Sequence, residues 1–226
     1  MCHLVGVRVG VLGGTGPAGS ALALRLADSG LAVRIGSRSA ERAEAICAEL
    51  RERWPGRSLD LEGAANEGAA DADVVVVATP WDGAVPTVAS VAARLSGKVV
   101  VSMANALTRV GSEFIPLIPP RGSIAVAVQG AAPDARVAAA FHHVPAHELG
   151  QLDHEVDCDV LVCADHPDAA ATTAELVERV PGCRALEAGT LSSAGAIEAF
   201  TAVLLQVNRR YKARSTIRLH RIGDDR

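Results

Sequence analysis

The chain has 226 residues, 49% of them hydrophobic and 3% aromatic, which is enough to bury the core of one large α/β domain with a smaller part attached. Its formal net charge of −4 gives no general attraction to nucleic acid or to an anionic membrane, so we expect neither as a partner. No apolar run approaches the roughly 20 residues of a membrane span. Residues 1–6 lack the charged and apolar segments of a secretion signal, which favours a cytoplasmic protein.

The cysteines argue against both a disulfide framework and a zinc site. They are odd in number and contain no CxxC pair, and they stand at Cys2, Cys47, Cys158, Cys163 and Cys183. We expect a reduced, buried thiol at each position and no metal ion.

The first half of the chain alternates short β-rich runs with helical stretches. In chain order we predict a strand at 8–12, a helix at 17–29, a strand at 32–36, a helix at 40–54 and strands at 73–78 and 98–102. Ser39 is the expected cap of the second helix. The last two strands are continuous and apolar, as in central strands of a parallel sheet with helices on both faces.

Prolines interrupt the middle of the chain, so 111–121 reads as a loop or crossover. Beyond it we predict strands at 135–141, 158–163 and 184–187 and helices at 167–180 and 193–208. The pattern predicts an α/β fold with a Rossmann-like, doubly wound, mainly parallel sheet. We place the nucleotide-binding domain at 1–145 and a smaller C-terminal α/β part at 146–226.

A dinucleotide-binding fingerprint, G-x-G-x-x-G, follows the first strand directly and opens an apolar helix. It consists of Gly14, Thr15, Gly16, Pro17, Ala18 and Gly19. We expect Gly14 to allow a tight turn, Gly16 to let backbone approach a pyrophosphate, and Gly19 to let the helix pack closely on the strand. The pyrophosphate would lie on the helix N-terminus, where free N–H groups favour an anion. A glycine-rich turn without a ligand is the other interpretation.

The second strand ends in Ser37 and Arg38, where an NAD enzyme places an acid for the adenosine ribose, and Arg42 follows one turn later. Arg38 can bind a 2′-phosphate through two N–H groups, Ser37 can donate its hydroxyl, and Arg42 adds a second cation. The pattern predicts NADP as the cofactor. The alternative is that both arginines are solvated surface charges.

Six short segments together carry a resemblance to a known family. They are GVLGGTGPAG at 10–19, GSR at 36–38, TPW at 79–81, FHHVP at 141–145, DCDVLVC at 157–163 and AGTLSS at 188–193. In order and spacing, from about residue 8 to residue 221, the chain resembles the NADPH-dependent coenzyme F420 reductases. The resemblance implies a cytoplasmic homodimer that transfers hydride between NADP(H) and the deazaflavin ring of F420, with the C-terminal part contributing to the deazaflavin site and to dimer contacts.

The resemblance also implies the roles of individual residues. Thr15, Gly16, Pro17, Ala18, Ser37, Arg38 and Arg42 would hold NADP, and His142, Val144 and Thr201 would line the place where the two rings meet. Thr79 is a further candidate for cofactor binding, and Asn105 could reach the nicotinamide side. His142 ends a predicted strand, so its imidazole could donate to a ring carbonyl or steady developing charge near neutral pH. A structural role is the alternative for His142 and Thr201. His143 should point to the other face of that strand and be structural.

Two segments depart from the family's usual pattern, and the tail of the chain is strongly basic. Residues 193–195 replace a run that brings a cationic contact in many relatives, and residues 103–106 differ from the family's usual proline-containing segment. The tail at 209–221 contains six Arg or Lys residues and no acid. Since F420 carries a phosphate and a glutamate tail, this basic segment would attract it, or it is a solvated or dimer-contact segment.

Two other functions stay open on the sequence alone. NADP-dependent imine and pyrroline-carboxylate reductases have a similar nucleotide domain, but they usually append a long all-helical dimerisation domain, and few residues here follow Ala194. The other is a non-catalytic NADP-binding sensor module, which would bind NADPH but would not oxidise it with any acceptor.

Overall fold

A computed structural model describes Leu4 and residues 6–222, so Cys2 lies outside the described residues. The first elements are β1 (Arg8–Leu12), α1 (Pro17–Asp28), β2 (Ala32–Ser37), α2 (Ala40–Arg53), β3 (Leu61–Ala65), α3 (Asn66–Ala70), β4 (Val74–Val77), α4 (Trp81–Leu95) and β5 (Val99–Ser102). The remaining ones are β6 (Leu107–Val110), β7 (Glu113–Pro116), α5 (Ile124–Ala131), β8 (Arg136–Ala139), α6 (Ala146–Leu149), β9 (Cys158–Ala164), α7 (Pro167–Glu178), β10 (Cys183–Glu187), a 3₁₀ turn (Leu191–Ser193) and α8 (Ala194–Tyr211).

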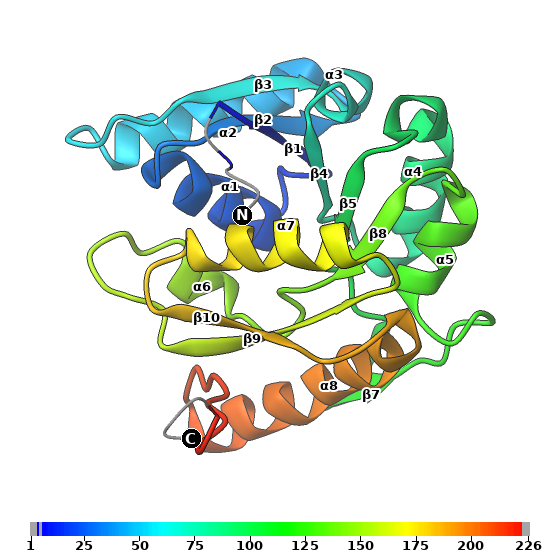
Figure 1. Cartoon of the computed structure of the whole chain (residues 1–226). Coiled ribbons are helices and arrows are strands. Elements are labelled where there is room, and N and C mark those ends of the chain that lie inside the picture. The colour runs from blue at the N-terminus through cyan, green and yellow to red at the C-terminus, as the bar shows by residue number, and fades with distance from the viewer. Residues whose placement is uncertain (1–3, 5, 223–226) are drawn as a thin grey trace.

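The described strands form one eight-stranded sheet in the order β10-β9-β8-β5-β4-β1-β2-β3 and a separate hairpin of β6 and β7. All neighbouring pairs of the large sheet are parallel except β8 with β9. Helices cover both faces of the sheet (Figure 1). The predicted Rossmann-like, doubly wound fold is confirmed.

The alternation of side chains along the central strands explains the two layers of helices. In β4, Val74 and Val76 face a core that α1, α2 and α7 complete, whereas Val75 and Val77 face a second core with α4, α5 and α8. Both sides of the strand are therefore buried, which is why it reads as an unbroken apolar run rather than as an alternating one.

Two sequence predictions are corrected. The segment at 111–121 is not wholly a loop, because residues 113–116 form β7, which pairs antiparallel with β6. Gly111, at φ 59°, lies in the turn between these strands. The strand predicted at 135–141 ends at Ala139, so His142 and His143 lie in the turn after it. Phe141, directly before them, is buried and has φ 65°, a left-handed conformation that costs energy for a side chain of this size.

The expectation for the cysteines is confirmed in part. Cys47, Cys158 and Cys163 are buried free thiols, and Cys183 is free but only half-buried. Burial raises the pKa of the first three thiols to about 11 and that of Cys183 to about 12, so they remain protonated near neutral pH. None of the helices in the described part of the chain is long and apolar enough to cross a membrane.

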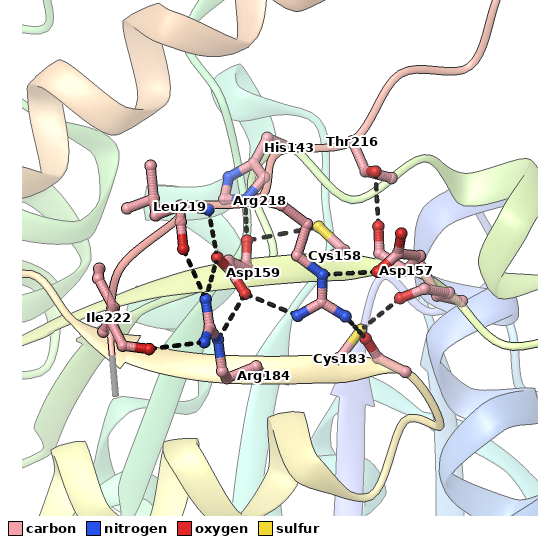
Figure 2. A network of polar contacts seen from close by, with 12 residues as sticks. His143, Asp157, Cys158, Asp159, Cys183, Arg184, Thr216, Arg218, Leu219 and Ile222 are labelled. Carbon is pink, nitrogen blue, oxygen red and sulfur yellow. Dashed lines mark hydrogen bonds and ion pairs between the residues drawn. The ribbon is translucent and has the colours of Figure 1, made fainter. Parts of the chain in front are cut away.

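A buried salt-bridge network fixes the end of the chain on the sheet. Asp159 of β9 is fully buried and receives hydrogen bonds from Arg184 of β10 at 2.8 and 2.9 Å and from Arg218 at 2.8 Å. Residues 213–222, the C-terminal strap, run back over β9 beside these groups (Figure 2). The arginines, Arg184 first among them, hold the pKa of the Asp159 carboxyl well below its usual range.

Candidate functional site

The glycine-rich turn after β1 has the geometry that close packing requires. The positive φ of this turn falls on Gly13, at 65°. Gly14 is needed because a Cβ there would lie 2.8 Å from the carbonyl oxygen of Val11. At Gly19 a Cβ would lie 2.9 Å from Ala78 Cβ and from Gly14 Cα, which confirms the predicted tight contact of helix and strand.

The N-terminus of α1 is prepared for an anion. Gly16 is its N-cap and has no side chain to bind the free N–H groups of the first turn, and Pro17 occupies the first helical position. A Cβ on Gly16 would meet only the carbonyl oxygen of Gly13, at 3.8 Å, so this side of the turn is open. Asn66, which the sequence analysis did not single out, steadies the turn because its Oδ1 accepts a hydrogen bond from Gly13 N–H at 3.2 Å.

The first cavity, of about 570 Å³, lies beside this turn. Its walls bring together Gly13, Thr15, Gly16, Ser37, Arg38, Arg42, Asn66, Thr79, Pro80, Asp82, Gly83, Pro86 and Thr87. Arg38 and Arg42 are exposed, and neither pairs with a carboxylate within the described part of the chain. Ser37 is buried, and its Oγ accepts a hydrogen bond from Ser39 N–H at 3.4 Å. Two uncompensated cations and a hydroxyl thus stand at one end of the cavity, a combination that suits a phosphate.

The second cavity, of about 330 Å³, shares Gly16, Thr79 and Pro80 with the first. Pro17, Ala18, Ala78, Trp81, Met103, Ala104, Asn105 and Leu107 complete its walls. It lies at the carboxyl ends of β1, β4 and β5, where ligands bind in folds of this kind. Thr79 Oγ1 is buried here and has no hydrogen-bond partner among the described residues. An orphaned hydroxyl in a cavity wall is typical of a ligand contact.

The third cavity, of about 390 Å³, shares Asn105 and Leu107 with the second. The other residues of its walls are His142, His143, Val144, Pro145, Ala146, His147, Thr201, Leu204, Leu205, Asn208 and Arg214. Since each cavity shares residues with the next, the three form one path along the strand ends. Every non-glycine residue that the sequence analysis placed at the NADP or ring-contact site lines this path, and so does Gly16.

Three of those residues, from segments far apart in the sequence, form one hydrogen-bonded cluster. Asn105 Nδ2 donates to the carbonyl oxygen of His142 at 2.9 Å. Thr201 Oγ1 lies 3.2 Å from the same oxygen and 3.3 Å from Asn105 Oδ1. The cluster fixes the wall between the second and third cavities.

Helix α8, which supplies Thr201, is tied to helix α5 by a buried carboxyl group. The two oxygens of Glu198 accept hydrogen bonds from Ile124 N–H at 2.9 Å and Ala125 N–H at 3.1 Å at the start of α5. Burial raises the pKa of this carboxyl to about 7 despite those bonds. This contact could not be predicted from the sequence, because a glutamate in a helix is usually exposed.

His142 is buried, and its imidazole has an unusual protonation behaviour. Desolvation, with a smaller contribution from His143, lowers its pKa to about 3, and the backbone of Met103 and Ala104 opposes the shift only in part. Neither ring nitrogen makes a well-formed hydrogen bond to the described residues. The imidazole is therefore neutral at pH 7. It can act only as a neutral donor or acceptor.

The structural role expected for His143 agrees with its contacts. Its Nε2 lies 2.7 Å from the carbonyl oxygen of Asp159, which can only accept, so Nε2 carries the proton. The residue lies in a turn, however, so the expected alternation of faces along a strand does not apply.

The surroundings of Gly195 and of the basic tail are well defined in the structure. A Cβ on Gly195 would lie 2.5 Å from the carbonyl oxygen of Gly122, so the first turn of α8 has no room for a side chain at this position. In the basic tail, Arg218 is engaged with Asp157 and Asp159. Arg209 and Arg210 line a separate depression, while Arg214 lines the third cavity.

The chain is similar in sequence to proteins of one known family over most of its length. A family model described as NADP oxidoreductase, coenzyme F420-dependent, matches residues 8–106. The F420-dependent NADP reductase of Methanocaldococcus jannaschii is 36% identical over 215 residues, which are 93% of this chain and 96% of that protein. The chain belongs to the F420-dependent NADP reductase family. A second member, from Methanothermobacter thermautotrophicus, is 36% identical over 224 residues and is covered to 95%, as is this chain.

Solved structures agree on the fold of this family member. A candidate F420-dependent NADP-reductase from Arthrobacter sp. FB24 superposes with a TM-score of 0.80 at 23% identity and is covered completely by 95% of this chain. The pyrroline carboxylate reductase of Plasmodium falciparum, solved with NADP bound, has a TM-score of 0.52 at 15% identity, and the match covers 70% of it and 91% of this chain. At these identities the likeness shows a shared fold.

Within the described residues, no group of three or more His, Cys, Asp or Glu side chains is placed to hold a metal ion.

Proposed function

We propose that this protein transfers hydride directly between NADP(H) and the deazaflavin coenzyme F420. The observation that carries the proposal is the path of three cavities, with phosphate-binding groups at one end and a mainly apolar cavity at the other. The relatives' activity supports it, since the proteins that are 36% identical over almost the whole chain are named F420-dependent NADP reductases.

The first cavity fits the adenosine and phosphate part of NADP. Ser37, Arg38 and Arg42 would bind the 2′-phosphate, because they are the uncompensated donors at that end. The pyrophosphate would lie against Gly16 and the first turn of α1, where no Cβ stands in the way. Thr15, Pro17 and Ala18 would complete this binding surface.

The second and third cavities fit the two reacting rings. Thr79 Oγ1 and Asn105 would contact the nicotinamide side, and Val144, His142 and Thr201 would border the acceptor. NADPH supplies the hydride from nicotinamide C4, and the deazaflavin ring accepts it. The protein's own task is to hold the rings in contact and exclude water, so positioning is the main catalytic effect.

The neutral state of His142 limits its part in the reaction. A buried imidazole with a pKa of about 3 cannot give a proton to the acceptor as an acid at pH 7. Its backbone carbonyl holds the side chains of Asn105 and Thr201, so the residue positions the wall between the two rings.

We also propose that residues 1–145 bind NADP, that 146–226 complete the deazaflavin site, and that the protein is a cytoplasmic homodimer. The exposed apolar side chains of α8 support the dimer, because Phe200, Val203, Val207 and Tyr211 recur at helical spacing on one face. Light scattering of Val203→Asp should show loss of the dimer, and an unchanged mass would remove α8 from the interface.

NADPH oxidation by the purified protein, measured separately with F420, FMN and a cyclic imine, tests the activity. We expect rapid turnover with F420 and none with the other acceptors. Turnover of the imine with F420 unchanged would assign the protein to imine reductases. Binding of NADPH with no turnover of any acceptor would favour the sensor module.

A further inference from the structure

Arg214 is held in a fixed position just past the end of α8. Lys212, at φ 51°, ends the helix and turns the chain back. Ala213 N–H then donates to the carbonyl oxygen of Asn208 at 2.9 Å, and Ser215 donates through both N–H and Oγ to Asn208 Oδ1, each at 2.6 Å. The residues on either side of Arg214 are therefore bound to the same asparagine, which itself lines the third cavity.

The far end of the C-terminal strap is fixed as well. Asp159 N–H donates to the carbonyl oxygen of Ile217 at 2.7 Å, and the Asp159 carboxylate receives Leu219 N–H at 2.6 Å besides the two arginines (Figure 2). A segment bound at both ends loses little further conformational freedom when it contacts a ligand. Arg214 thus differs from an arginine on a solvated tail.

The guanidinium of Arg214 is available at the mouth of the third cavity. Its side chain is 57% exposed, and its nearest acid is Glu148, with Nη1 and Oε1 3.6 Å apart, too far for a hydrogen bond. Glu148 is also contacted by His154 Nε2 at 2.8 Å and by His147 Nδ1 at 3.2 Å. Hydrogen bonds from these histidines lower the pKa of Glu148. The N–H groups of Arg214 remain open to an incoming anion.

We propose that Arg214 is the residue that recognises the anionic side chain of the acceptor, its phosphate or glutamate carboxylates, as that chain leaves the third cavity. The inference rests on the proposed function. Among the described basic residues of the tail, Arg214 is the one that lines the third cavity, whereas Arg218 is engaged with Asp159, and Arg209 and Arg210 lie at another depression. Gly195 offers no cation at the start of α8. Arg214 therefore determines the preference for the complete coenzyme over its ring system alone.

Initial-rate kinetics with two acceptors test this assignment. The acceptors are F420 and the same deazaflavin with only its ribityl chain, without phosphate or glutamate. The variants are Arg214→Gln, Arg214→Lys as the conservative replacement, and Arg210→Gln as a control that removes the same charge four residues earlier. Thermal melting checks that each variant is folded.

For Arg214→Gln we expect the KM for F420 to rise about tenfold, the loss of one charge-assisted contact, with the KM for the truncated acceptor changed less than twofold. Arg214→Lys should recover part of the affinity, and Arg210→Gln should change it less than twofold. Equal effects on both acceptors, no effect on either, or an equal effect of Arg210→Gln would each overturn the assignment. If the wild-type protein reduced neither acceptor, the proposed function itself would fall, and the inference with it.

Discussion

Recognition of the 2′-phosphate by Arg38 can be tested through the choice between two cofactors. Arg38 and Arg42 are exposed and without carboxylate partners in the described chain, beside buried Ser37 in the first cavity. A charge-assisted bond contributes about 1.5–3 kcal/mol. Because Arg38 is exposed, we expect its contribution at the lower end of that energy range. About 1.4 kcal/mol corresponds to a tenfold change in affinity. Arg38→Asp also adds repulsion, so the KM for NADPH should rise at least tenfold.

The assay is initial-rate kinetics with NADPH and NADH at saturating acceptor. NADH has no 2′-phosphate, so its KM should change far less in Arg38→Asp than that of NADPH. Arg53→Gln serves as a control, because it removes one exposed charge from the other end of α2. Added salt should weaken NADPH binding more in the wild-type protein than in the variant. Equal changes of KM for both cofactors would refute the role of Arg38.

Three further predictions concern other parts of the molecule. Gly16→Val should weaken NADPH binding at least tenfold in calorimetry and leave the melting temperature nearly unchanged, because φ −77° and ψ 164° suit valine and a Cβ there meets nothing closer than 3.8 Å; unchanged binding would contradict it. His142→Ala keeps the backbone carbonyl that holds Asn105 and Thr201 but removes the imidazole from the wall of the third cavity, so it should slow single-turnover hydride transfer and leave the NADP dissociation constant within about threefold. The pH–rate profile from pH 5 to 8 should keep its shape because the pKa of His142 is near 3. An unchanged single-turnover rate would leave His142 with a structural role alone. Asp159→Asn should lower the free energy of unfolding at pH 7 by about 3 kcal/mol in urea titrations, since it removes the buried negative charge that both Arg184 and Arg218 contact. The folded-state pKa of Asp159 is depressed, so its stabilisation is present above its ordinary pKa near 4 and fades as the pH falls below it. A difference between variant and wild type that did not shrink below pH 4 would contradict the network.

The β1-α1-β2-α2 unit was predicted to within two residues because its signals are local. The apolar runs, the glycines and the Ser39 cap, whose Oγ accepts from Arg42 N–H at 3.2 Å, each act over a few positions. The hairpin of β6 and β7 was missed because prolines argue against strands. Pro116 is the last residue of β7 in a two-stranded hairpin, where a missing N–H is tolerated. The sequence analysis also offered no element for α4, which contains Pro86.

The candidate site could be predicted only in part. The residues proposed to bind phosphate could be predicted because Gly16, Ser37 and Arg38 follow the first two strands closely, as in other dinucleotide-binding folds. His142, Asn105 and Thr201 came from the resemblance alone, since their contact depends on segments almost one hundred residues apart. The protonation state of His142 and the pairing of Arg218 with Asp159 depend on burial, which one sequence does not display.

The most direct test of the central claim is the fate of a deuterium label at nicotinamide C4. The purified protein is mixed in ordinary water with F420 and with NADPH labelled stereospecifically at that carbon, and the reduced deazaflavin is analysed by mass spectrometry. We expect one of the two stereoisomers to pass its deuterium quantitatively to the deazaflavin, because the cavities proposed for the two rings adjoin and share Asn105 and Leu107. Reduced deazaflavin without deuterium from either stereoisomer would contradict direct transfer.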